Sequence, residues 1–392
     1  MSADSDAGVR LLMGGQDLFS AMALAMDHAQ HSIAVETYIF HFEGRANHVA
    51  EAMVRAAQRG VHVHLLVDGV GTGQLPALWQ QRFAESGVQW HVYSPLTGPD
   101  FWELSRWRRL HRKLCVVDAQ TAFCGGINLL DDFIDSKFPE GLPAPRLDYA
   151  VQVQGPVARH IHEAMNQLWS RLEALRELKS QNLGAAIDVL NGADQDPKPP
   201  IHSAVQLVLR DNVRHRARIE SVYRKALASA KHEMVLANAY FFPNLRLQKA
   251  LINAAQRGVR VRLLLQGHYG YFWPYRASRH LYAQLLAVGV EIYEYHASVL
   301  HAKVAVVDGQ WATVGSSNLD PFSLLLAREA NLVVHEVGFA QALQASLETA
   351  LHTGSTRVDA HTFEQRTWVA RWVDGLASTL LRLGVLLTGK RY

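Results

Sequence analysis

Cysteine is scarce in this chain, and long apolar runs are absent. Only two cysteines, Cys115 and Cys124, occur among the 392 residues, which is too few for a disulfide framework and indicates a reducing compartment. The first residues, MSADSDAGVRLL, lack the basic region and apolar core of a signal peptide. No run reaches the roughly 18 uninterrupted apolar residues of a spanning helix. We therefore expect a cytoplasmic protein, or one attached to a membrane surface without crossing it.

The chain also has little excess of charge of either sign. Its 39 basic and 36 acidic residues give a formal net charge of +3, which is too mild to demand a nucleic-acid partner. Hydrophobic residues make up 49% and charged residues 19%, which predicts a packed globular protein with room for two domains. There is no P-loop string and no G-x-G-x-x-G after a strand, which argues against these nucleotide-binding motifs.

What the chain does contain is an internal repeat. The string AAQRGVHVHLLVDG from Ala56 returns as AAQRGVRVRLLLQG from Ala254. SIAVETYIF returns as MVLANAYFF, and ESGVQWHVY as AVGVEIYEY. The last repeated block begins at Leu110 in the first copy and at Leu300 in the second. It reads LHRKLCVVDAQTAFCGGINLLD in the first and LHAKVAVVDGQWATVGSSNLDP in the second. Four similar blocks in the same order indicate a duplicated domain.

Each copy alternates amphipathic helices with strands, as in LFSAMALAMDHAQHSIAVETYIF. This alternation favours an α/β fold in which each half has a mixed, mostly parallel sheet flanked by helices. Glycine, aspartate and three prolines interrupt the periodicity in LNGADQDPKPPIHSA, between the copies. We therefore predict a first domain at 1–195, a second at 196–355 and a separate tail at 356–392.

The last repeated string places chemistry on a hairpin. In the second copy, His301 and Lys303 lie two residues apart, so that their side chains share one face of a strand. Asp308 lies an odd number of residues from His301, so its side chain would point to the opposite face of the strand, roughly 23 Å further along. Together with the glycine that follows it, Asp308 predicts a tight turn. The returning strand would bring Ser316 and Asn318 back beside His301 and Lys303.

The first copy carries the matching set: His111, Lys113, a turn at Asp118, Gly126 in place of the serine, and Asn128. This set of groups suits a phosphodiester. Lysine and asparagine can hold the charged oxygens as the phosphorus becomes five-coordinate. Histidine titrates near neutral pH, so that one can attack as the free base while another donates a proton. Two copies facing each other across a pseudo-twofold axis would form one composite active site.

H-x-K-x4-D followed by G-x2-N, present twice, resembles the phospholipase D superfamily. The resemblance extends from Leu11 to about Ser355. Within the superfamily, ANAYFFP, DNVRHRARIE and WATVGSSNLDPFS resemble the bacterial cardiolipin synthases, most closely the short form called cardiolipin synthase B. The resemblance implies a duplicated phospholipase D-type domain and a phosphatidyltransferase that needs neither cofactor nor metal.

The resemblance also implies a mechanism. One histidine, which we predict to be His111, attacks the phosphorus of phosphatidylglycerol and forms a phosphatidyl-histidine intermediate. His301 protonates the departing glycerol and then deprotonates a hydroxyl of a second phosphatidylglycerol, so that the products are cardiolipin and glycerol. Phosphatidylethanolamine or a soluble polyol could replace one phosphatidylglycerol.

Further roles follow from the family pattern. The phosphate would be held by the lysines and asparagines of both motifs: Lys113, Lys303, Asn128 and Asn318. The family places an acid behind each histidine to orient its ring, and Asp148 and Glu329 match these positions. Asp118 and Asp308 belong to the catalytic signature, but their strand parity predicts a scaffold role. Gly126 lacks the hydroxyl of Ser316, so the two halves need not be interchangeable.

Other polar groups allow alternatives. The pairs His62 with His64 and His160 with His162 could bind a metal, but neither has cysteines or carboxylates at zinc spacing, and we expect no metal. Glu36 matches Asn238 in the repeat, and could orient the acceptor or simply pair with an arginine.

Three stretches could meet a membrane. FWELSRWRRLHRK, at 101–113, and YGYFWPYRASRH, at 269–280, combine aromatic residues with arginines, which suits an anionic lipid interface or single-stranded nucleic acid. The tail repeats apolar residues every three or four positions: Trp368, Trp372, Leu376, Leu380, Leu383 and Leu387. Charged residues interrupt this stripe, so the tail should lie in the interface or dock on the second domain.

Taken with the resemblance, these features predict a monomer-sufficient enzyme bound peripherally at the cytoplasmic face of the bacterial inner membrane. Its partners would be phosphatidylglycerol and the membrane surface. A phospholipase D-type hydrolase, with water resolving the intermediate, is the first alternative. A nucleic-acid phosphodiesterase is a second, which the charge of +3 and the apolar tail disfavour. A catalytically dead binding module is a third, which the intact histidines, lysines and asparagines disfavour.

Overall fold

A computed structural model describes residues 8–95, 108–135, 138–179, 203–211, 215–268, 272–320 and 327–387. The elements of the first half are β1 (Val9–Met13), α1 (Gly14–Asp27), β2 (Ser32–Thr37), η1 (Gly44–Ala46), α2 (Asn47–Gln58), β3 (His62–Asp68), α3 (Ala77–Ser86), β4 (Gln89–Tyr93), β5 (Arg109–Leu110), β6 (Leu114–Val117), β7 (Thr121–Gly125), β8 (Tyr149–Gln154) and α4 (Pro156–Lys179).

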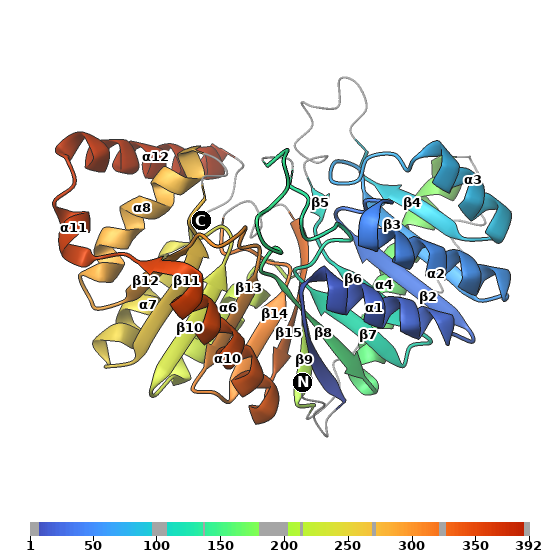
Figure 1. The fold of residues 1–392 in the computed structure, drawn as a ribbon, viewed down its shortest axis with the longest axis horizontal. Helices are drawn as coiled ribbons and strands as arrows, with labels where there is room; N and C mark the ends of the chain where they lie inside the picture. The colour runs from blue at the N-terminus through green and yellow to red at the C-terminus, as the bar shows by residue number, and fades with distance from the viewer. Residues whose placement is uncertain are drawn as a thin grey trace.

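The second half repeats this order. Its elements are β9 (Val205–Arg210), α6 (Arg218–Ser229), β10 (Glu233–Asn238), α7 (Leu245–Gln256), β11 (Arg260–Gln266), α8 (Phe272–Leu286), β12 (Glu291–Tyr295), β13 (Lys303–Val307), β14 (Trp311–Gly315), β15 (Ala327–Val334), α10 (Val337–Thr353), β16 (Ser355–Arg357), α11 (Ala360–Glu364) and α12 (Trp368–Leu387). Figure 1 shows the two halves side by side, each with a sheet flanked by helices.

The two sheets have matching strand orders. The first runs β1-β8-β7-β6-β2-β3-β4, and the second contains the corresponding series β9-β15-β14-β13-β10-β11-β12. Both are mixed, as predicted, but they are not mostly parallel. Within the first sheet only the β2–β3 and β3–β4 pairings of the described strands are parallel, and the others are antiparallel. The reason is that each repeated hairpin turns back tightly, and that β8 and β1 then continue the sheet antiparallel to their neighbours.

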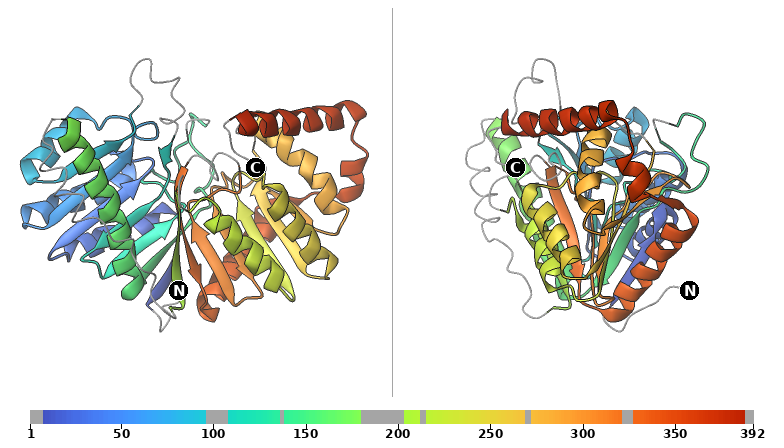
Figure 2. Two further views of the ribbon diagram at one scale, coloured as in Figure 1. Left: turned by 180° about the vertical axis from the view of Figure 1, so that it is seen from behind. Right: turned by 90° about the vertical axis from the view of Figure 1, so that its left-hand side faces the viewer.

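A single apolar core crosses the boundary between the halves. It joins Val116 and Val151 of the first sheet to Val304 and Leu332 of the second. Strands β7 and β8 lie against β14 and β15, and α10 of the second half packs on β1 of the first. Figure 2 shows the same close apposition from behind. Burying each such side chain stabilises the fold by about 1.5–3 kcal/mol, so the halves form one structural unit.

The two predicted hairpin turns are present and nearly identical. Asp118 and Asp308 have φ of 52° and 51°, in the left-handed region. The carboxylate of Asp118 accepts the backbone N–H groups of three successive residues, beginning at Gln30. Asp308 does the same for three residues beginning at Lys231. Each carboxylate therefore ties the tip of its hairpin to the start of the neighbouring strand.

The C-terminal residues extend the second half. Strand β16 pairs with β12, so the predicted tail begins within a strand of the second sheet, and α12 packs on α8. Among the described residues, no helix is both long and apolar enough to cross a membrane. The predicted boundary at 195/196 and the aromatic residues at 101–107 and 271 lie outside the described residues.

Candidate active site

Each motif histidine is fixed by the backbone of the opposite half. His111 directly follows β5, which pairs with β15, and its N–H donates to the carbonyl of Arg328 at 3.0 Å. The N–H of His301 donates to the carbonyl of Leu147 at 2.9 Å. These reciprocal bonds hold the starts of β6 and β13 at the boundary between the halves, in the composite arrangement that the duplication predicts.

The imidazole rings are held in the same crossed manner. His111 Nδ1 lies 3.0 Å from a carboxylate oxygen of Glu329, and His301 Nδ1 lies 2.6 Å from Asp148. Both carboxylates are buried, with Glu329 at 0% and Asp148 at 2% exposure. An acid on Nδ1 fixes the ring and leaves Nε2 directed to the reaction. The acids predicted from the sequence therefore each orient the histidine of the other half.

Two buried lysines lie beside the histidines. Lys113 Nζ donates to the carbonyl of His111 at 2.9 Å, and Lys303 Nζ donates to that of His301. Burial, with repulsion from Lys303, lowers the pKa of Lys113 to about 7. Burial lowers the pKa of Lys303 to about 8. Two ammonium groups that are so strongly desolvated form a centre that an anion would stabilise.

The titration of the other groups follows from the same burial. Burial lowers the pKa of His111, which the charge of Glu329 opposes. Burial and the positive charge of Lys303 lower the pKa of His301 well below its ordinary value. Burial raises the pKa of Asp148 to about 7, although Lys303 opposes this shift. Both histidines are therefore neutral at pH 7, and Asp148 titrates close to that pH.

The residues at the Ser316 and Gly126 positions touch the acids. Ser316 Oγ donates to Glu329 at 2.5 Å. A Cβ added to Gly126 would stand 2.3 Å from Oδ1 of Asp148, closer than side chains tolerate. We expected Ser316 beside His301, but the pairing of β14 with β15 instead brings its hydroxyl to the acid of His111.

The asparagines brace the strand ends. Asn128 Oδ1 accepts the N–H of Ile39 at 3.3 Å, just beyond the end of β2. Asn318 is 5% exposed and follows β14. In the second half the corresponding backbone bond comes from Asn238, whose Oδ1 accepts the N–H of Leu319 at 3.2 Å.

Glu36 pairs with an arginine, one of the two alternatives that the sequence left open. Its carboxylate lies 2.9 Å from Nε of Arg112, and both side chains are buried. Burial raises the pKa of Glu36, and Arg112 opposes the shift. Arg112 stands between His111 and Lys113 in the sequence, but its side chain reaches Glu36, whereas those of His111 and Lys113 reach Glu329 and the carbonyl of His111.

Sequence reasoning missed three residues at the site. Tyr38 packs its ring on that of His111, with 4.9 Å between centroids. Asp68 is fully buried and accepts the N–H of Leu110 at 2.8 Å, which fixes the residue before His111. Arg146 adds a positive charge near His301. Tyr38 could have been found because ETYIF and NAYFF share a tyrosine at the same repeat position.

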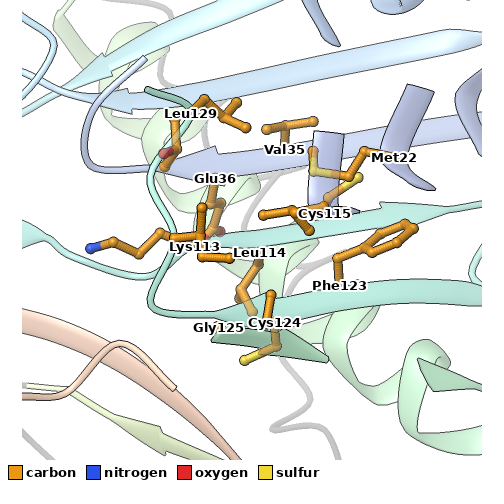
Figure 3. A pocket seen from close by; sticks show the side chains of 14 residues that line it. Met22, Val35, Glu36, Lys113, Leu114, Cys115, Phe123, Cys124, Gly125 and Leu129 are labelled. Carbon is orange, nitrogen blue, oxygen red and sulfur yellow. The ribbon is translucent and has the colours of Figure 1, made fainter. Parts of the chain in front are cut away.

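An apolar cavity lies behind Lys113, in the core of the first half. Its lining includes Met22, Val35, Cys115, Phe123 and Leu129. Figure 3 shows the Lys113 side chain extending away from these apolar groups. The cavity is therefore a gap in the packing of α1 on the first sheet, and the ammonium group of Lys113 points away from it.

His64, one of the histidines considered as a metal ligand, packs against an aromatic ring instead. His64 stacks on Trp169 with 4.2 Å between ring centroids. Within the described ranges, no three histidines, cysteines or acids gather in a way that could hold a metal ion.

Comparisons with known proteins agree with this geometry. The family model described as cardiolipin synthase, PLD-like domain, matches residues 22–169 and 223–351. Cardiolipin synthase B of Escherichia coli (strain K12) is 36% identical over 97% of this chain and 89% of its own length. Cardiolipin synthase of Geobacillus sp. (strain WCH70) is 28% identical over 95% of this chain and 71% of its own.

A solved structure shares the fold. Phosphatidylserine synthase of Haemophilus influenzae Rd KW20 has a TM-score of 0.69 at 13% identity, covering 98% of this chain and 95% of that one. At that identity the likeness concerns the fold alone. The two-part family match and the nearly full-length relatives concern the sequence, and they cover both histidine motifs. The chain belongs to the phospholipase D-like family of cardiolipin synthases.

Proposed function

We propose that this chain transfers a phosphatidyl group from one phosphatidylglycerol to another phospholipid, releasing glycerol and forming cardiolipin. The observation that carries the proposal is the crossed pair of histidines, each with Nδ1 on an acid of the other half, beside two buried lysines. The names of the relatives supply the substrate class. Two histidines are what a double displacement requires, because one must hold the phosphatidyl group while the other moves protons.

In the first step, we assign the attack to His111. Its Nε2 forms a bond to phosphorus while the bond from phosphorus to the glycerol oxygen breaks. The imidazole becomes positively charged as it does so, and an ionised carboxylate at Nδ1 stabilises that charge. Glu329 suits this task because its carboxylate also accepts the Ser316 hydroxyl, so that a second contact holds it in place beside the ring of His111.

His301 supplies and later removes the proton. The His301–Asp148 pair holds a proton below about pH 7, where Asp148 is protonated. In the first step this pair delivers a proton to the departing glycerol oxygen. In the second step it takes the proton from a hydroxyl of the acceptor lipid, whose oxygen attacks phosphorus while the bond to His111 breaks. The enzyme returns to its starting state.

The lysines and asparagines of the two motifs would stabilise the phosphorus as negative charge gathers on its oxygens. Burial desolvates Lys113 and Lys303, which lowers their pKa values. A bound phosphodiester would oppose this shift by restoring the protonated state. Asn128 and Asn318 follow the returning strands and add neutral donors.

We propose that the enzyme works peripherally on the cytoplasmic face of the inner membrane, as a monomer sufficient for one site. Its substrate class is a membrane lipid, and both active-site halves lie in one chain. The two cysteines, Cys115 and Cys124, are buried and free, and they pack into different cores on opposite faces of the β6–β7 hairpin; so few cysteines suit a reducing compartment.

The test is lipid mass spectrometry on the purified chain with phosphatidylglycerol, without added metal. We expect cardiolipin and glycerol from the wild type, and neither from His111→Ala or His301→Ala. His62→Ala, which changes an exposed histidine outside the site, is the matched control and should keep full activity. Phosphatidic acid as the only product would mean that water resolves the intermediate. No lipid turnover, with cleavage of a nucleic-acid phosphodiester, would overturn the proposal.

A further inference from the structure

Helix α12 presents its apolar stripe outward. It packs against α8, yet Trp368 is 73% exposed, Trp372 62%, Leu380 49% and Leu383 50%. These residues recur at helical spacing and so lie on one side. A surface helix of a water-soluble protein ordinarily turns that side toward its core. The sequence predicted the stripe, but here the stripe is the face that the protein leaves uncovered.

The inner face of α12 combines a small apolar contact, in which Ala377 and Leu381 pack on Phe242 and Ala277, with buried ion pairs. Asp374 is 1% exposed. One of its oxygens lies 2.8 Å from Nε of Arg276 on α8, and the other 2.8 Å from Nη1 of Arg366. Arg276 also donates to the carbonyl of Ala370 at 2.9 Å. A buried carboxylate without these partners would be costly, so the pairs determine which side of the helix faces out.

Helix α8 adds aromatic rings to the same surface. Phe272 is 57% and Trp273 49% exposed, and their ring centroids lie 5.3 Å apart. The guanidinium of Arg276, which reaches Asp374 on α12, lies 6.0 Å from the ring of Phe272. We call the following six residues the outer apolar face: Phe272, Trp273, Trp368, Trp372, Leu380 and Leu383. Contiguous exposed apolar surface of this kind marks an interaction site.

The charge around the outer apolar face is positive. Asp374 is the single acidic residue of α12 and is buried, whereas Arg371 is exposed and Arg382 is partly exposed. Tryptophans beside arginines suit the boundary between anionic headgroups and acyl chains. The location fits too, because α12 lies toward the same edge of the molecule as β5, which leads into His111 (Figure 1).

We propose that the outer apolar face docks this enzyme on an anionic bilayer, with α12 lying in the plane of the headgroups and the active site turned toward the lipid. The inference rests on the proposed function in one respect, which is that the substrate resides in that bilayer. It adds the orientation: the second half meets the membrane through α12 and α8, and the buried pairs of Asp374 hold the apolar stripe outward.

The experiment is co-sedimentation of the full chain with phosphatidylglycerol–phosphatidylcholine vesicles. Trp372→Glu and Leu380→Glu should each weaken vesicle binding at least tenfold. Each replaces an apolar side chain that would be buried in the bilayer by a negative charge, which anionic lipid repels. Arg371→Glu should weaken it more modestly, by about fivefold or more, and only at low salt. Leu78→Glu, which changes a 64% exposed leucine on α3 of the first half, is the matched control and should bind as the wild type does.

Activity on phosphatidylglycerol dispersed in neutral detergent micelles separates docking from chemistry. We expect Trp372→Glu and Leu380→Glu to keep their turnover in micelles and lose it on vesicles. Vesicle binding equal to that of the wild type would overturn the inference. So would a wild-type dimer, seen by light scattering, that these variants convert to a monomer, because the face would then be a protein interface. If the wild type binds vesicles, the variants do not, and neither lipid form is turned over, the docking stands and the proposed function fails.

Discussion

The two halves of the active site are built on one plan but differ at the acid behind each histidine. His111 pairs with Glu329, which also receives the hydroxyl of Ser316. His301 pairs with Asp148, whose carboxylate occupies the space where a side chain at position 126 would stand. One half therefore combines a glycine with an aspartate, and the other combines a serine with a glutamate. This indicates that the residue at the Gly126 or Ser316 position and the acid behind the histidine vary together.

That difference suits two roles. A glutamate that also accepts the hydroxyl of Ser316 is fixed beside His111, where it can stabilise a cationic phosphatidyl-histidine. An aspartate without that donor has a pKa raised by burial to about 7, where it can exchange a proton with its histidine. The differences beside the two acids therefore support the division of roles that we propose for His111 and His301.

The largest expected effect separates the histidines by their roles. With phosphatidyl-p-nitrophenol, the leaving group needs no proton. We expect His301→Ala to release one equivalent of nitrophenol as a burst and then stall as the phosphatidyl-His111 adduct. We expect His111→Ala to release none, with turnover reduced roughly 10⁴-fold or more. Stopped-flow absorbance and mass spectrometry of the acid-sensitive adduct measure both. A burst from His111→Ala and none from His301→Ala would exchange the assignments.

The second prediction exchanges the residues beside the acids. Gly126→Ser would put a Cβ 2.3 Å from the present position of Asp148 Oδ1 and so displace the acid from His301. We expect a loss of about 100-fold in kcat and of about 1–3 kcal/mol in the free energy of unfolding. Ser316→Gly removes the hydrogen bond to Glu329 and the one from the N–H of Ala330 without displacing the acid, and should cost about tenfold in kcat, or roughly 1.4 kcal/mol.

The control for this exchange is Gly126→Ser combined with Asp148→Glu, which copies the other half. If serine and glutamate form a matched pair, the double variant should recover part of the lost stability, measured by urea unfolding. Equal effects of Gly126→Ser and Ser316→Gly would mean that the two half-sites are not distinguished at this position.

The third prediction concerns pH. Three groups that the proposed mechanism needs protonated have pKa values near 7 to 8: Lys113, Asp148 and Lys303. As pH rises through this range each loses its proton, so kcat/KM should fall with a slope steeper than tenfold per pH unit. On the acid side the decline should begin below pH 6.5, because the pKa of His111 is lowered and its free base persists there.

Rate profiles between pH 5.5 and 9.5 on micelles measure this prediction. Lys113→Arg keeps its charge at high pH and should make the alkaline decline shallower. A flat kcat/KM from pH 7 to 9 would show that neither lysine nor the His301–Asp148 pair must be protonated.

Much of this comparison could be predicted from local sequence patterns. The repeated strings predict the duplication. The alternation of side chains along a strand predicts that His301 and Lys303 share a face and that Asp308 lies apart from them. The crossing of the acids could not be predicted, because His111 and Glu329 are 218 residues apart and their contact depends on how two sheets meet. Periodicity likewise identified the apolar stripe of α12 but not which way it faces, since that depends on the ion pairs of Asp374.

The smallest expected effect lies at the tips of the two hairpins. Ala119 has φ of 54°, and its counterpart in the second half, Gly309, has φ of 62°. A left-handed backbone costs alanine about 1 kcal/mol, whereas glycine adopts it freely. Ala119→Gly should therefore raise the free energy of unfolding by up to about 1 kcal/mol, and Gly309→Ala should lower it by about 1 kcal/mol. Urea unfolding measures both, and kcat should not change because the turns lie at the far end of β6 and β13 from the histidines. If both substitutions were neutral, the backbone of the tips would relax out of the left-handed region, and the bonds from Asp118 and Asp308 would not be what holds it there.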